Sequence, residues 1–266
     1  GLGSSEFVDL NVNIKSCKQI HLKDTRNYSG TWYHSSMLIG TASGYNGSNN
    51  DRCHNINEKI VIDNVDDLYF YSSYIAGFVG LGSYNYDCQS DVSITNCKAI
   101  TSYGSYNDAA GDGSNANTGI GMGHCAHDNA MTVTINNCET LGIKNGIGLS
   151  GSCYNNEFTA DVTNCGDMEA GYIGTQYGCY DNELTINISS PMTDRPHKLS
   201  AYGIGLGMSN YRTAEDFKCE INVDGYTGGI RIAPYQNSNF LYARIGIGGN
   251  SYSTNKDFPL ETDINI

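Results

Sequence analysis

Apolar and polar residues alternate along several short segments of this chain. Met131, Val133 and Ile135 alternate with Thr132 and Thr134, and a period of two is typical of a β-strand that buries one face. The same pattern recurs in segments whose apolar members are Phe158, Ala160 and Val162; Leu184, Ile186 and Ile188; and Leu241, Ala243 and Ile245. Gly (32) and Tyr (20) are abundant and Pro is scarce (4), which favours strands and turns. The fold class is therefore expected to be all-β.

A second recurring element is an apolar residue followed by glycine. It occurs at Ile39-Gly40, Val79-Gly80, Ile120-Gly121, Ile147-Gly148, Ile173-Gly174 and Ile204-Gly205, with Ile230-Arg231 as a last, deviant member. The spacing between the two elements is constant. Ile135 lies 15 residues after Ile120, and Val162 lies 15 residues after Ile147. The whole unit repeats at 26 to 31 residues over most of the chain and at about 40 near its start. This repetition predicts a parallel solenoid of about seven coils with loop insertions.

Asparagines recur at two positions of the repeat. One set precedes the alternating strand, at Asn129, Asn156, Asn182 and Asn239, and the other follows it, at Asn64, Asn96, Asn137 and Asn164. Asn tolerates left-handed backbone geometry and can hydrogen-bond a stacked neighbour, so both sets are expected at corners where the chain turns.

Asparagine columns, aliphatic stacks and repeats of roughly 25 residues resemble the right-handed parallel β-helix superfamily, which contains pectate-lyase-like enzymes and phage tailspikes. The resemblance implies a right-handed parallel β-helix over residues 31–250. A linker with a partial first coil is expected over residues 1–30, and a tail or cap over residues 251–266. The resemblance is specific for the fold and unspecific for activity.

Charge and hydropathy narrow the expected partners. The formal net charge is −13, and neutralising phosphates requires clustered Lys and Arg, so nucleic acid is not expected. The acidity suits solubility, or a surface that meets neutral or cationic material. No stretch approaches the roughly 20 apolar residues of a membrane span, so membrane insertion is not expected either. No motif indicates a cofactor.

The ten cysteines recur in register with the repeat. Cys97, Cys138 and Cys165 share one column, which includes Cys17 if residues 13–17 form a partial coil, and Cys125, Cys153 and Cys179 gather at a second corner. A column spreads its members along an axis, whereas zinc needs four converging ligands, so no metal site is expected. Stacked parallel strands also orient their Cβ atoms alike. Mostly free thiols are therefore expected, although disulfides between adjacent coils stay open.

The recurring glycines follow inward Ile or Val residues and are expected to face outward. A glycine on a strand indicates that another backbone, chain or ligand approaches closely. One interpretation is a bend or tight packing under a returning loop. The other is a subunit interface, expected in a homotrimer, along the strip formed by Gly80, Gly121, Gly148, Gly174 and Gly205.

The leading candidate for ligand contact is an aromatic and acidic corner. Aligned segments place His127, Tyr154 and Tyr180 in one column, with Asp128 and Asp181 beside it. Aromatic faces next to amides and carboxylates suit sugar rings. The alternative is an ordinary Tyr/Asn-rich turn.

Three insertions, at residues 43–57, 102–117 and 208–218, are further candidates for recognition. The second insertion carries the remaining proposed ligand contacts, Tyr103, Tyr106 and Asp108. These insertions could equally have no role in binding.

Glycoside cleavage would need two carboxylates about 5 Å or about 6.5–9.5 Å apart. Neighbouring coils could bring Asp66 and Asp67 near Asp91, or Glu139 near Asp167, but an acidic protein meets that criterion by chance and no catalytic motif is present. The expected function is recognition of a bacterial surface polysaccharide, on a virion tail or outside the cell, by a module resembling a phage tailspike or tail fibre. A secreted polysaccharide-degrading enzyme and a structural spacer are the alternatives.

Overall fold

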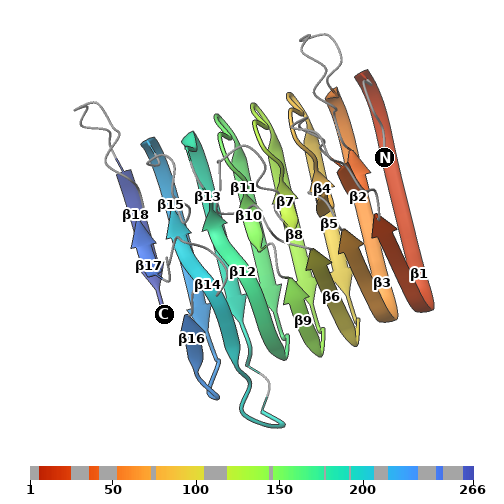
Figure 1. Ribbon diagram of the computed structural model, residues 1–266, viewed down its shortest axis with the longest axis vertical. Coiled ribbons are helices and arrows are strands. Elements are labelled where there is room, and N and C mark those ends of the chain that lie inside the picture. Colours follow the sequence, from red (N-terminus) through yellow and green to blue (C-terminus); the bar gives the residue numbers. More distant parts are fainter. Residues whose placement is uncertain are drawn as a thin grey trace.

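The computed structural model describes residues 6–24, 36–41, 53–72, 76–104, 119–143, 146–176, 178–191, 193–206, 215–232, 244–247 and 260–266. Within these residues the protein contains no helix, and 18 strands form one large sheet (Figure 1). The strands pair in parallel, as β8 does with β11 and β11 with β13. The expected all-β class is confirmed, and the parallel sheet is compatible with a β-helical solenoid.

The strands belong to three stacks, in each of which successive repeats pair in register. The central stack contains β1 (Glu6–Asp24), β3 (His54–Ser72), β5 (Gln89–Thr95), β8 (Ala130–Asn136), β11 (Glu157–Thr163), β13 (Tyr180–Ser189), β15 (Glu215–Asp224) and β18 (Leu260–Asn265). The glycine stack contains β2 (Ser36–Thr41), β4 (Ala76–Leu81), β7 (Ile120–Met122), β10 (Ile147–Leu149), the second parts of β12 (Asp167–Thr175) and β14 (Leu199–Leu206), and β17 (Arg244–Ile247). The third stack contains the second parts of β1 and β3, then β6 (Ala99–Gly104), β9 (Thr140–Ile143), the first parts of β12 and β14, and β16 (Ile230–Ile232).

The inward residues of the central stack form the core. Val92, Val133, Ala160 and Ile186 lie in one column and each is 0% exposed. Equivalent residues on neighbouring strands recur at about 4.8 Å, so each aliphatic side chain packs on the one in the next repeat. The alternation read from the sequence therefore marks the core correctly.

Both predicted asparagine sets lie at corners. Asn64, Asn96 and Asn137 each have a φ of 56°, the left-handed conformation that Asn tolerates. In the inner set, the Nδ2 of Asn129 donates to the Oδ1 of Asn156 over 3.1 Å, and Asn156 repeats this contact with Asn182 over 2.9 Å. Asn239 lies outside the described residues.

The expectation that the recurring glycines face outward is wrong. All members of the predicted strip are buried, and a Cβ atom built on Gly148 would lie 2.0 Å from the carbonyl oxygen of Gly174. Their φ angles, such as 134° at Gly148, also suit glycine alone. The backbone that approaches each glycine is the neighbouring repeat of the same chain.

The expected end of the glycine column is also wrong. Ile230 and Arg231 pair with Leu199 and Ser200 in the third stack, whereas Gly246 pairs with Gly205. Ile230-Arg231-Ile232 alternates like any half-buried strand, so its sequence pattern did not reveal its stack. Ile245 accordingly belongs to the glycine stack, and β18 supplies the last strand of the central stack.

The two ends of the chain contribute strands to the sheet. β1 pairs with β3 along most of its length, and this places Cys17 opposite Val65 as the partial-coil interpretation expected. β18 lies within the segment expected to be a tail or cap, and it continues the central stack beside β15. Figure 1 shows β1 and β18 on opposite sides of the array.

Candidate functional site

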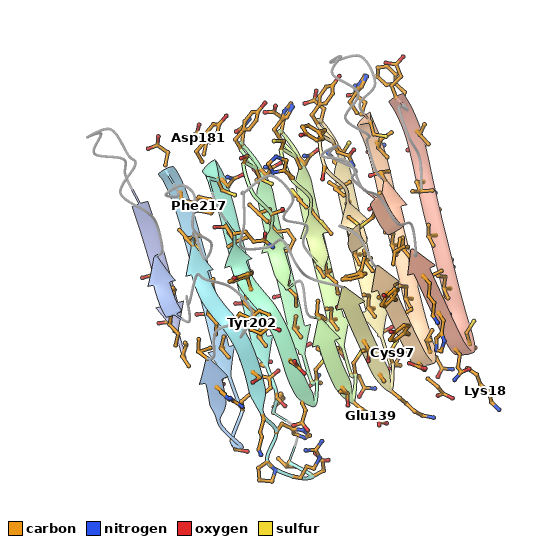
Figure 2. All side chains as sticks on the ribbon, in the orientation of Figure 1. Lys18, Cys97, Glu139, Asp181, Tyr202 and Phe217 are labelled. Atoms are coloured by element: carbon orange, nitrogen blue, oxygen red, sulfur yellow. The ribbon has the colours of Figure 1, made fainter. Side chains whose placement is uncertain are left out.

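In most repeats an Asp or Asn lies at the corner that precedes the strand of the central stack. The φ angles are 52° at Asp87, 56° at Asp128 and 51° at Asp181, and Asp and Asn adopt this left-handed conformation more readily than most residues. The acidic corner column consists of Asn55, Asp87, Asp128, Asn155, Asp181 and Asp216. Figure 2 shows Asp181 and Glu139 at opposite ends of the sheet.

An aromatic column runs beside the acidic corner column. Parallel bridges connect His54, Tyr86, His127, Tyr154 and Tyr180 in that order. The ring centroids are 4.7, 5.2, 4.5 and 5.0 Å apart, and the rings lie within 16° of parallel. The predicted column of His127, Tyr154 and Tyr180 is therefore confirmed as a structural feature.

Two members of the aromatic column were not predicted. Tyr86-Asp87 has the spacing of Tyr180-Asp181, but Cys88 follows it where the other repeats have Asn. The missing Asn hid the alignment, although the distance from Tyr86 to the alternating strand was a usable signal. His54 lies inside the insertion expected over residues 43–57, whereas the structure places it at the start of β3, so its alignment could be read only from the structure.

Neighbouring rings of the aromatic column cover most of one another's faces. A ring stacked on both sides cannot also stack on a sugar, so His127 and Tyr154 present edges only. Tyr180 is stacked on one side, by Tyr154, and is 39% exposed. Among the three predicted rings, the sugar-stacking interpretation is therefore restricted to Tyr180.

A groove of about 790 Å³ runs along the acidic corner column. Its lining includes the corner residues Asp87, Asp128, Asn155, Asp181 and Asp216, and the residues two positions further along each strand, Gln89, Ala130, Glu157, Glu183 and Lys218. A second groove, of about 740 Å³, adjoins it at Gln89 and Ala130 and continues to Asp9 and Asn11 of β1. Six strand spacings from β1 to β15 give a combined length of roughly 30 Å.

The lining of the groove is acidic and held by hydrogen bonds. The Oδ2 of Asp128 accepts from the Nδ1 of His127 over 2.7 Å, and its Oδ1 accepts from Asn155. The hydrogen bond from His127 lowers the pKa of Asp128, so this carboxylate is ionised at neutral pH. Lys218 forms an ion pair with Glu183 across neighbouring strands. The groove therefore offers fixed acceptors and repels anions.

The proposed contacts in the second insertion are placed only in part. Tyr103 lies in β6, where it pairs with Tyr71 of β3. Both residues belong to the third stack, and neither lines a groove. Tyr106 and Asp108 lie outside the described residues. Their role in binding stays a prediction.

The first pair of candidate catalytic carboxylates is not brought together. Asp91 pairs with Lys59 early in β3, whereas Asp67 pairs with Ala99 near the far end of that strand. Asp66 forms an ion pair with Lys98, with 2.7 Å between Oδ1 and Nζ. The Oδ2 of Asp67 lies 2.8 Å from the Nε2 of His21.

The second pair of candidate catalytic carboxylates lies on neighbouring strands. Glu139 precedes Thr140, which pairs with Asp167. Arg195 approaches Asp167 to 2.8 Å, and its hydrogen bond lowers the pKa of that carboxyl group. Asp167 is thus held ionised, which is the wrong state for a general acid.

All ten cysteines are free thiols. Burial raises the pKa of Cys88 and of Cys219 to about 12, so these two thiols are neutral and poor nucleophiles. Within the described part of the chain, no three His, Cys, Asp or Glu side chains are placed to hold a metal ion.

Neither the character of the described elements nor comparison with known proteins assigns the chain to a family. Across the described ranges, no helix has the length and apolar character needed to cross a membrane. Searches of protein-family models, of curated proteins and of solved structures find no match to this chain.

Proposed function

We propose that the protein binds an extended, neutral polysaccharide in the groove along the acidic corner column. The observation that carries this proposal is a polar groove that crosses the strands from β1 to β15. A polymer can lie along such a groove and meet equivalent carboxylates and amides in successive repeats. Sugar hydroxyls donate hydrogen bonds to these acceptors, and the fixed negative charges disfavour acidic polysaccharides.

The proposed setting is recognition of a bacterial surface, on a virion tail or outside the cell. The sequence features that support it are the repeat and the asparagine columns, which resemble the right-handed parallel β-helix superfamily. In this proposal about seven right-handed coils form a rigid rod. Assembly of three such rods would present three grooves, and the homotrimer stays a prediction. The glycine strip cannot be its contact surface, because neighbouring repeats bury it.

Incubation with a panel of neutral and acidic bacterial surface polysaccharides tests the function. We expect retention of the protein on one or more neutral polymers without shortening of the chains. Shortened chains would indicate an enzyme, and failure to retain any polymer would overturn the proposal.

Two groove variants locate the binding. Ala130 lines both grooves, so Ala130→Trp should weaken binding about tenfold or more, a loss of about 1.4 kcal/mol. Asp181→Ala should weaken it by removing an acceptor. Thr140→Trp introduces the same side chain on β9 and should bind as the wild type does. Equal affinity of Ala130→Trp and Thr140→Trp would contradict the site.

A further inference from the structure

The interior of the sheet stack contains a buried carboxyl group. Glu58 of β3 is 3% exposed, and it is the only Asp or Glu buried to this extent among the described residues. It faces inward, in register with Leu10 of β1 and Ser90 of β5. An apolar interior normally excludes such a group unless it is paired.

The polar contacts of Glu58 are incomplete. The Oγ of Ser90 donates to its Oε1 over 2.7 Å. Its Oε2 lies beside Thr41 of β2 without a hydrogen bond of good geometry. Thr41 instead accepts from the Nδ2 of buried Asn85 over 2.8 Å. Neutral groups of β2 and β5 therefore lie next to the carboxyl group.

No Lys, Arg or His of the described residues acts on Glu58, and Lys59 is exposed on the opposite face of β3. The N-terminal amine of the chain lowers the pKa of Glu58, but burial outweighs that effect. The nearby thiol of Cys88 is neutral, since burial raises its pKa to about 12. The same desolvation raises the pKa of Glu58 to about 7.

We propose that Glu58 makes the part of the solenoid around β2, β3 and β5 responsive to pH. The neutral carboxyl group packs in the closed interior. When its proton passes to water, a buried negative charge remains beside Thr41 and Ser90, and these strands open locally to hydrate it. The inference does not depend on what the groove binds.

The pKa difference fixes the direction of the effect. The carboxyl group has an ordinary pKa of 4.5 when exposed and of about 7 in the closed structure, so the closed structure holds one more proton between these values. Stability of these strands is fully present below about pH 4.5, falls as pH rises to about 7, and is constant above it. The opening constant rises by up to about tenfold per pH unit within that window.

Hydrogen exchange across this pH window tests the proposal. Protection factors, corrected for the intrinsic exchange rate, should fall between pH 5 and pH 7 for amides of β2, β3 and β5, and should change little for β11 and β13. Glu58→Gln should abolish the fall. Glu169→Gln, an exposed carboxylate on β12, should keep it. The same fall in Glu58→Gln and in the wild type would overturn the proposal.

A direct titration of the wild-type protein covers the case in which Glu58→Gln fails to fold. The side-chain carboxyl carbon of Glu58 can be followed by NMR from pH 4 to pH 8. A midpoint near 7 supports the proposal. A midpoint near 4.5 would show that the interior does not hold the proton, and would overturn it.

Discussion

At the scale of single residues, the glycine column decides how closely the repeats stack. A Cβ atom at Gly148 would meet the carbonyl oxygen of Gly174 at 2.0 Å, and the φ of 134° is unfavourable for any other residue. Gly148→Ala should therefore lower the free energy of unfolding by about 3 kcal/mol or more, from overpacking and backbone strain together. Chemical denaturation measures this loss.

Variants at two other glycines distinguish overpacking from backbone strain. Gly246 has a φ of 122° but no atom of the described residues within 4 Å of its Cβ position, so Gly246→Ala should show the backbone strain alone. Gly142 has its nearest atom at 3.6 Å and no left-handed angle, so Gly142→Ala should be nearly neutral. Equal losses in all three variants would contradict the stacking account.

The buried ladder of Asn129, Asn156 and Asn182 should contribute more to stability than the asparagine contacts on the outer face of the central stack. Asn156 is 2% exposed, and its Nδ2 donates to the carbonyl oxygen of Tyr154 and to Asn182. Asn156→Ala would leave buried partners unpaired and should cost about 2–4 kcal/mol. Asn187 donates to Asp161 on the outer face, where water replaces the lost contact, so Asn187→Ala should cost less than about 1 kcal/mol. Thermal or denaturant unfolding of both variants checks the difference.

At the scale of elements, the aromatic column divides into rings that support the corner and one ring that can meet a ligand. Tyr154 stacks on both sides, whereas Tyr180 is stacked by Tyr154 alone. Tyr154→Ala should mainly lower stability. Tyr180→Ala should weaken polysaccharide binding several-fold with a smaller effect on unfolding. Calorimetric titration beside denaturation of both variants tests this, and identical behaviour would contradict the division.

The sequence predicted the strands and corners well because both depend on local chemistry. Period-two alternation located the inward positions from β5 to β13, and asparagines located the left-handed corners. The last repeat was misassigned because Ile230-Arg231-Ile232 carries the same alternation as its neighbours. The direction in which the glycines face could not be read from alternation, since that depends on the φ angle and on the carbonyl of the next repeat.

At the scale of the whole molecule, the candidate site exists only because the repeats stack. Asp87 and Asp216 are far apart in sequence, yet they line one groove through equivalent corners. The sequence revealed three of the aromatic rings and two of the carboxylates at this edge. It could not reveal that the rings cover one another, because ring faces are set by the spacing of the strands.

The proposed homotrimer is tested by the molecular mass in solution. Light scattering of the 28.8 kDa chain should give about three times that mass if the tailspike-like assembly forms. A mass equal to one chain would contradict the assembly and leave the groove proposal standing, since every residue of the groove comes from a single chain.

The central claim is that the groove along the acidic corner column is the binding surface. A hydrogen-exchange footprint with a retained neutral polysaccharide tests it most directly. The account predicts added protection at the corner amides around Asp128, Asn155 and Asp181, and none at β6 and β9 on the third stack. Protection confined to β6 and β9, with the corner unchanged, would contradict it.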